Sequence, residues 1–381
     1  MADLGEIARA VGEDYLRTRR TTPFQRKAFR AIQRCRTEAM GSILAVCDNC
    51  GAEHPLFRSC RNRNCPRCQA QARAGWLEAR EQELLPVPYF HVVFTVPEML
   101  NPIALYCPEV FYAALLRAAG NALLDVGQTK LHARLGCLTV LHTWGQNLSL
   151  HPHVHCVVPG GGFSLDGRRW IGVRKSSYLL PIKVLSRRFR TLLCESLRAA
   201  ARSGKLERLP KNVPLHLTIE GAAAQEWIAY AKSPFGGPEQ VLEYLSRYTH
   251  RIAISNRRIL SFTDQEVTFE WRDYADGNRI KHSTLDVFEF LRRFLMHVLP
   301  DRFVRIRYFG YLAGRKRGTN IELARALIGS PIPLCFRESS KPLILCPACH
   351  AARVASFEVL HIAGYVRPPP QTSLSGSTYL A

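Results

Sequence analysis

Long apolar runs are missing from this chain of 381 residues. No stretch of about 18 consecutive apolar residues occurs, so we expect no helix that spans a membrane. The first residues, Met1–Glu6, lack the basic region and apolar run of a secretory signal. We therefore expect the thirteen cysteines to be reduced thiols or metal ligands rather than disulfides. A phosphate-binding loop of the G-x-x-x-x-G-K-[ST] type is also absent, which argues against an attached helicase.

Acidic residues are scarce relative to basic ones. The chain has 52 Lys+Arg against 31 Asp+Glu, and 52 − 31 gives a net charge of +21. Such an excess favours a polyanionic partner, and nucleic acid is the default. The apolar content of 47% is ordinary for a folded protein, and the length suits two or three domains.

Two closely spaced cysteine pairs, fourteen residues apart, predict a structural zinc site. Its four ligands would be Cys47, Cys50, Cys65 and Cys68. Each pair forms a turn whose sulfurs converge, and two such turns complete a tetrahedron with no position left for substrate. Cys60 and His54 are spare candidates. A third pair, Cys346 and Cys349, has no obvious second pair, although Cys335 and His361 could complete it, so a second zinc ion stays open.

A histidine-rich strand precedes a run of three glycines. His151, His153 and His155 alternate with other residues, so a strand places them on one side of the sheet. Imidazoles at this spacing can converge on one metal ion. The alternative is a strand whose histidines only form hydrogen bonds. Gly160–Gly162 predict a tight turn and the close approach of another segment.

The order of the remaining elements predicts an α+β fold with helices on one face of a sheet. We expect strands at 89–96, 138–144, 151–159, 213–219, 251–258 and 267–271, the second and third forming a hairpin. We expect helices within 1–40 and at 69–84, 108–126, 182–202, 238–248 and 284–299. Prolines at 86 and 88 indicate a domain boundary, giving segments 1–85, 86–330 and 331–381, the last with a disordered tail.

Two tyrosines, Tyr244 and Tyr248, lie four residues apart on the expected helix 238–248, so both phenols share one face. A phenol is a competent nucleophile towards a phosphodiester once its proton is removed and the phosphate is polarised. An imidazole-bound divalent ion can do the polarising. The commoner fate of such a pair is core packing, and taken alone the tyrosines do not outweigh it.

Arginines gather at three places that suit DNA contacts, and a solvated face is the alternative at each. They crowd the cysteine pairs, flank the second tyrosine and alternate with aromatics in the run 302–311. The residues are Arg61, Arg63, Arg67, Arg247, Arg251, Arg305 and Arg307. The helix after Pro23 carries a further basic side, which could contact DNA or simply face solvent. Its residues are Arg26, Lys27, Arg30 and Arg34.

Over nearly its whole length the sequence resembles the two-tyrosine HUH transposases of rolling-circle bacterial insertion sequences. The resemblance rests on Cys60-Arg61-Asn62-Arg63, Cys65-Pro66-Arg67-Cys68, Pro88-Tyr89-Phe90-His91, Trp144-Gly145-Gln146, His151-Pro152-His153-Val154-His155 and Tyr244-Leu245-Ser246-Arg247-Tyr248. Asn64 departs from the pattern, because the family usually has histidine before the Cys-Pro pair. The departure leaves the cysteines intact.

The resemblance implies an HUH-type antiparallel sheet, preceded by a small helical zinc-binding domain that recognises DNA. His153 and His155 would bind Mg²⁺ or Mn²⁺, with Gln146 or His151 as third ligand. Tyr244 and Tyr248 would form 5′-phosphotyrosine links and leave a 3′-OH. The substrates would be single-stranded element ends and target DNA, in the bacterial cytoplasm beside the nucleoid. A relaxase or rolling-circle replication initiator would share this chemistry, and a non-catalytic zinc-finger DNA-binding protein is the alternative from another class.

Overall fold

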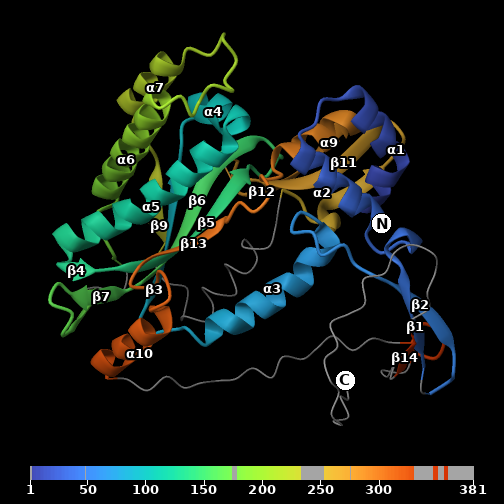
Figure 1. Cartoon of the computed structure of the whole chain (residues 1–381), viewed down its shortest axis with the longest axis horizontal. Coiled ribbons are helices and arrows are strands. Elements are labelled where there is room, and N and C mark those ends of the chain that lie inside the picture. Colours follow the sequence, from blue (N-terminus) through green and yellow to red (C-terminus); the bar gives the residue numbers. More distant parts are fainter. Residues whose placement is uncertain are drawn as a thin grey trace.

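A five-stranded antiparallel sheet forms the centre of the protein (Figure 1). The computed structural model describes residues 2–47, 49–173, 178–232, 253–274, 276–329, 346–350 and 356–358. The strand order is β13 (Ile306–Gly310), β5 (Gly136–Trp144), β6 (Leu150–Pro159), β3 (Tyr89–Thr95) and β9 (Ala229–Lys232). β5 and β6 form the expected hairpin, and β5 is buried along its whole length because both of its faces are covered.

Helices cover one face of this sheet (Figure 1). They are α4 (Asn101–Tyr106), α5 (Pro108–Lys130), α6 (Ile182–Arg202) and α7 (Leu215–Ala224). The core between them contains Phe94 of β3 against Phe189 of α6, with ring centroids 4.7 Å apart. By length and composition alone α5 could cross a membrane, but 67% of its apolar window is buried, as in the core helix of a globular domain.

Two predicted strands are wrong. Of the expected strand 251–258, the described residues 253–258 form a bend and the 3-10 turn Asn256–Arg258. Within the expected strand 213–219, helix α7 begins at Leu215 instead. Apolar residues at 213, 215, 217 and 219 alternate as in a strand, yet the chain continues into three alanines, which favour helix. Thr218, Ile219 and Ala222 are the buried residues, at helical spacing. The helix lies along α6, to which it is joined by the ion pair of Arg198 with Glu220 at 2.7 Å.

The opposite face of the sheet packs against α3 (Pro66–Glu81) (Figure 1). Trp76 and Leu77 of α3 contact a small cluster that the sheet supplies from Tyr89, Leu138, Val140 and Val157. α10 (Arg317–Ile328) packs beside this region, over Phe163 and Tyr311. The histidine side chains project from this same face.

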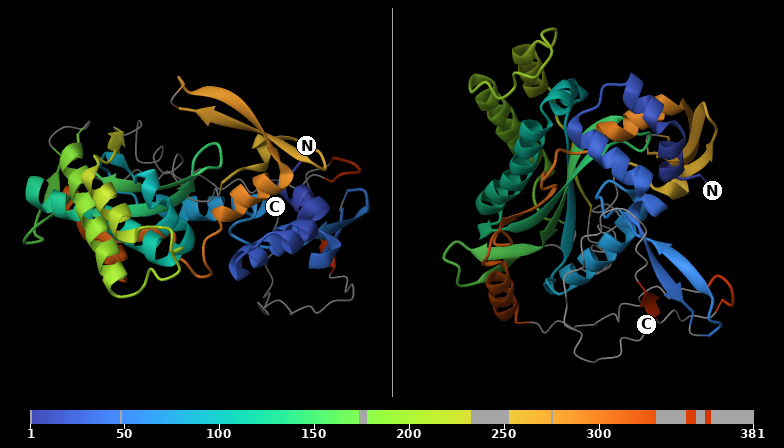
Figure 2. Two further views of the ribbon diagram at one scale, coloured as in Figure 1. Left: turned by 90° about the horizontal axis from the view of Figure 1, so that it is seen from above. Right: turned by 45° about the vertical axis from the view of Figure 1, so that its right-hand side comes forward.

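A second core joins the N-terminal helices to residues 253–298 (Figure 2). It packs α1 (Leu4–Thr18) and α2 (Pro23–Arg34) against α9 (Val287–Met296) and the sheet β10 (Ile259–Phe262), β11 (Glu266–Asp273) and β12 (Arg279–Asp286). The Tyr15 ring meets the edge of Phe288 at 5.5 Å. The helices of segment 1–85 thus share a core with residues 253–298, and the predicted domain boundaries stay a prediction.

Two small sheets complete the architecture. β1 (Ser42–Val46) pairs with β2 (Glu53–Phe57) on one side and with β14 (Ser356–Glu358) on the other. β7 (Gly161–Ser164) lies between β4 (Ala133–Arg134) and β8 (Trp170–Gly172). The expected close approach at the glycine run is confirmed: a Cβ on Gly162 would lie 2.4 Å from the Arg134 carbonyl oxygen. Short 3-10 turns occur at Glu38–Met40, Glu98–Leu100 and Asn256–Arg258.

Candidate metal centres and DNA-binding surface

Three histidines of the β5–β6 hairpin converge. His142, His153 and His155 each place a ring nitrogen within 4.8 Å of the other two. The register explains the cluster: His142 lies directly opposite His153, and His155 is two residues further along β6, on the same face. His142 and His155 are buried, and His153 is half-buried at the edge of the cluster.

The structure brings His142, rather than the predicted Gln146 or His151, into the cluster with His153 and His155. Gln146 turns away and donates to the Tyr274 hydroxyl across 3.5 Å. The His151 ring lies outside the cluster, although its carbonyl oxygen is 2.7 Å from His153 Nδ1. A register drawn for the predicted hairpin would have pointed to His142, because the residue facing a metal ligand across two strands shares its side of the sheet.

Neighbouring groups hold two of these imidazoles in place. His91 Nε2 on β3 lies 2.7 Å from His155 Nδ1, and the two rings are parallel within 2°. His153 Nδ1 is held in the same way by the His151 carbonyl. In both histidines Nδ1 is engaged, so Nε2 is the nitrogen available to an ion. Such outer contacts orient metal-binding histidines in known sites.

Burial keeps His153 and His155 neutral at pH 7. Desolvation lowers the pKa of His153 to about 4, and it also lowers the pKa of His155, which has His142, His153 and His91 as neighbours. Neutral imidazole is the form that binds metals. The donor set therefore fits a divalent first-row ion. Because Mg²⁺ prefers oxygen ligands and the cluster offers only nitrogen, it fits Mn²⁺ better than Mg²⁺.

A four-cysteine cluster lies where α2, the loop before α3 and α3 meet. Its members are Cys35, Cys60, Cys65 and Cys68. The Cys68 sulfur is 3.6 Å from both the Cys35 and the Cys60 sulfur. A zinc–sulfur bond of about 2.3 Å gives a tetrahedral sulfur–sulfur edge of about 3.8 Å, so the cluster has the dimensions of a structural zinc site.

The structure divides the predicted zinc ligands between two places. Cys65 and Cys68 belong to the cluster just described, whereas Cys47 and Cys50 lie beside Cys346 and Cys349. Cys47 and Cys50 occupy the turn of the β1–β2 hairpin, whose five-residue strands place that turn roughly 17 Å from the opposite end. The spare candidate Cys60 proves to be a cluster member. Cys35 caps α2 without a partner at C-x2-C spacing, so no sequence signal marked it.

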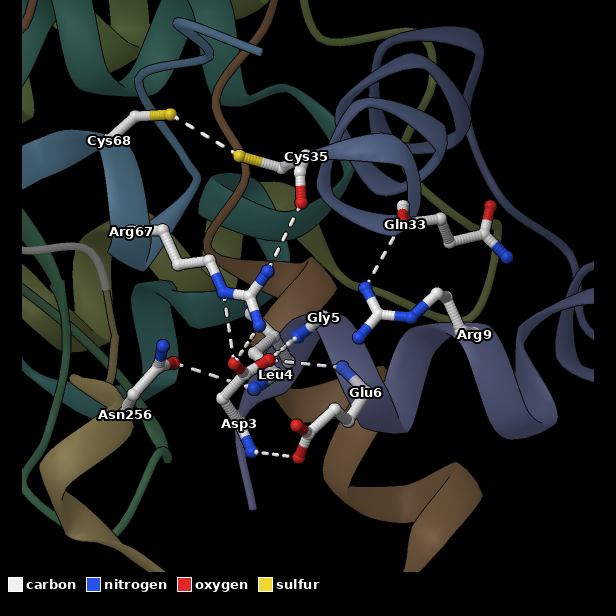
Figure 3. A network of polar contacts seen from close by, with 10 residues as sticks. All are labelled: Asp3, Leu4, Gly5, Glu6, Arg9, Gln33, Cys35, Arg67, Cys68 and Asn256. Carbon is white, nitrogen blue, oxygen red and sulfur yellow. Dashed lines mark hydrogen bonds and ion pairs between the residues drawn. The ribbon is translucent and has the colours of Figure 1, made fainter. Parts of the chain in front are cut away.

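Arg67 fastens helix α1 to this cluster (Figure 3). Its Nε donates to the Asp3 carboxylate at 2.9 Å, and its Nη1 donates to the Cys35 carbonyl oxygen at 3.1 Å. Asp3 is also the N-cap of α1 and accepts from the Gly5 amide at 2.7 Å. The guanidinium that sequence reasoning assigned to DNA is thus engaged within the protein.

Of the other arginines predicted to bind DNA, some are engaged within the protein and others are accessible. Arg63 donates to the carbonyl oxygens of Leu299 and Pro300, and Arg305 is buried, which lowers its pKa to about 10. Arg307 is half-buried over the Phe303 ring, at 5.3 Å from the centroid. Arg61 is exposed. Six residues named in the predictions lie outside the described part of the chain: Tyr244, Arg247, Tyr248, Arg251, Cys335 and His361. The expected helix 238–248 lies outside it as well.

A basic groove runs along α2. Its lining includes the exposed side chains of Arg26, Arg30 and Arg34 together with Thr21 and Cys60. Lys27 also lines it and pairs with Asp301 at 3.0 Å. The groove therefore presents unpaired positive charge next to the four-cysteine cluster, as a surface for phosphate groups would.

This chain is similar to known transposases over most of its length. Residues 136–319 match the family described as "Putative transposase", and residues 7–96 match the family "Transposase zinc-binding domain". The chain is 43% identical over 390 residues to "Putative transposase y4qJ" of Sinorhizobium fredii, covering 96% of this chain and 97% of that protein. It is 29% identical over 304 residues to the transposase for insertion sequence element IS801 of Pseudomonas savastanoi pv. phaseolicola, covering 74% of this chain and 69% of that one.

Among solved structures, the metal-free conjugative relaxase TrwC in complex with oriT DNA aligns with 42% of this chain and 71% of its own. The identity is 13% and the TM-score 0.24. The metal-bound form of the same complex gives 12% and 0.23. Similarity at this level does not establish a shared fold.

Proposed function

Because this chain belongs to the IS91-type HUH transposases with an N-terminal zinc-binding domain, we propose that it cuts and rejoins single-stranded DNA through covalent phosphotyrosine links. Family membership makes the protein a rolling-circle transposase, an enzyme that nicks DNA. The observation that carries the proposed chemistry is the convergence of His142, His153 and His155 on one face of the sheet.

These three histidines would hold the catalytic ion. A bound Mn²⁺ or Mg²⁺ would supply Lewis-acid polarisation of the scissile phosphate. The chain's own contribution is to hold three converging imidazoles before substrate arrives. Two of them, His155 and His153, are fixed by His91 and by the His151 carbonyl. The ligands are thereby preorganised, so little reorganisation is needed when DNA binds.

Tyr244 and Tyr248 are the proposed nucleophiles. A phenol oxygen forms a bond to the phosphorus, the bond from phosphorus to the 3′-oxygen breaks, and the phenol proton leaves to solvent while the 3′-oxygen is protonated. Attack by a 3′-OH on the phosphotyrosine reverses these changes and rejoins the strand. Chain connectivity supports the assignment: β9 ends at Lys232, opposite His91, and Tyr244 follows after 244 − 232 = 12 residues.

The groove along α2 is the proposed path for the DNA backbone next to the zinc cluster. Its three exposed arginines would contact phosphates, as would Arg61, which is next to Cys60 in the sequence. Such phosphate contacts do not distinguish one base sequence from another. Each phosphate contact makes binding more dependent on salt. Replacing Arg26, Arg30 and Arg34 by Ala should therefore weaken binding and lower the salt slope by about 2–3.

Covalent trapping tests the nucleophiles. The protein is incubated with a single-stranded oligonucleotide that carries the element's own end, with and without Mn²⁺, and the adduct is separated under denaturing conditions. We expect an adduct that needs the ion, persists in Tyr→Phe variants at one position, and disappears in Tyr244→Phe/Tyr248→Phe. An adduct in the double variant would reject the mechanism. A protein that binds this oligonucleotide but forms no adduct under any condition would support the non-catalytic alternative.

A further inference from the structure

We propose that the chain holds a second structural zinc ion, bound between its two ends by Cys47 and Cys50 from the β1–β2 turn and by Cys346 and Cys349 from near the C-terminus. The four sulfurs lie within 4.8 Å of one another. The family match for zinc binding ends at residue 96, so it does not include the second pair.

Sulfur distances identify the kind of site. Cys47 and Cys349 have their sulfurs 3.7 Å apart, and Cys50 and Cys346 have theirs 3.8 Å apart. A disulfide needs about 2.05 Å, so these separations exclude bonded pairs. They equal the edge of about 3.8 Å that a zinc tetrathiolate requires.

Both pairs adopt the same turn. The Gly51 amide donates to the Cys47 carbonyl oxygen at 2.8 Å, and the His350 amide donates to the Cys346 carbonyl oxygen at 2.9 Å. The residue after each second cysteine is left-handed, with φ of 67° at Gly51 and 56° at His350. Glycine takes this conformation readily, but histidine takes it at a cost of about 1 kcal/mol or more. The matched turns aim each pair's sulfurs at a common point, which explains why His350 adopts the strained conformation.

Surrounding groups complete the site. The Asn49 side-chain amide donates to the Cys349 sulfur at 3.5 Å, and His54 Nε2 lies 3.4 Å from the Cys346 sulfur. Both are groups that can donate a hydrogen bond to a thiolate and stabilise its charge. Strand pairing adds an independent constraint, because β14 continues the hairpin sheet, with Ala45 of β1 opposite Phe357 (Figure 1).

This ion would join segments 349 − 47 = 302 residues apart in the sequence. A bond that closes so long a loop restricts the unfolded chain strongly, and the binding free energy of a structural zinc ion is available to folding. The C-terminal cysteine pair thus becomes part of the zinc-binding module rather than a separate finger. No residue of strands β1 and β2 belongs to the described hydrophobic clusters, so the β1–β2 hairpin would depend on this ion for order.

Measuring the zinc content of the protein tests for the second ion directly. Purified full-length protein whose histidine cluster has been loaded with Mn²⁺ should contain two zinc ions per chain by plasma mass spectrometry. Cys346→Ser/Cys349→Ser should contain one, Cys47→Ser/Cys50→Ser should contain one, and the variant with all four changes should also contain one. Cys107→Ser alters a buried cysteine outside both clusters and should keep two. Hydrogen exchange of peptides covering residues 42–46 should speed up in either double variant.

Two results would overturn the proposal. One is a single zinc ion in the wild-type protein. The other is retention of two ions in Cys346→Ser/Cys349→Ser. If a variant fails to fold, X-ray absorption of the wild-type protein still decides, because four sulfur neighbours per zinc are expected and a nitrogen neighbour would contradict the ligand set. None of these readouts depends on DNA cleavage.

Discussion

Replacement of His142 by phenylalanine tests which residue is the third metal ligand: His142, Gln146 or His151. The His142 ring is buried and stacks on Trp144 with centroids 4.4 Å apart, so phenylalanine keeps the packing and removes only the nitrogens. Outer-sphere substitutions at metal sites usually cost ten- to a hundredfold in affinity. Loss of one of three direct ligands should therefore cost about a hundredfold or more, or about 2.8 kcal/mol.

The assay is titration of the zinc-loaded protein with Mn²⁺ at pH 7, followed by electron paramagnetic resonance of the free ion. His151→Phe and Gln146→Leu are the matched controls, because neither side chain joins the cluster and the His151 carbonyl survives. Both should bind Mn²⁺ within about threefold of the wild type. Wild-type affinity in His142→Phe, together with a large loss in either control, would refute the ligand assignment.

Three further changes probe the surroundings. His91→Phe should lower Mn²⁺ affinity ten- to a hundredfold in the same titration, because it removes the group that orients His155. Arg67→Met should lower the free energy of unfolding in urea by about 2 kcal/mol. This value lies between the costs of breaking an exposed and a buried ion pair, because the Arg67 and Asp3 side chains are 23% and 14% exposed. An unchanged urea midpoint would show that Arg67 does not stabilise the contact between α1 and the cysteine cluster. Burial lowers the pKa of His297 to about 4 from about 6.5 when unfolded, so its contribution to stability is complete above pH 6.5 and falls towards pH 4. His297→Phe should flatten that part of the stability profile by up to about 1.4 kcal/mol per pH unit, and an unchanged slope would contradict this.

The sheet and its histidines were predictable because their signals are local. Strict alternation in 151–155 fixed which side chains share a face, and the glycines after it marked the close approach to Arg134. The same reasoning identified the β5–β6 hairpin. It did not supply the register, so His142 was missed although it lies in a correctly predicted strand.

The metal ligands from distant segments were not predictable in this way. Spacing suggested one site from Cys47, Cys50, Cys65 and Cys68, but a hairpin separates the two pairs and each finds partners elsewhere. Cys35 stands alone in its segment. The strand wrongly assigned to 213–219 has a similar origin, since alternating apolar residues favour a strand locally and packing along α6 decides for helix.

Peptide mapping of the DNA adduct tests the central claim most directly. Trypsin cleaves after Arg247, which separates Tyr244 and Tyr248 into different peptides, 233–247 and 248–251. Wild-type protein is trapped on a single-stranded element end with Mn²⁺, digested with nuclease and trypsin, and analysed by mass spectrometry. We expect a nucleotide attached to one or both of these peptides and to no other. Attachment at a residue elsewhere in the chain would contradict the central claim.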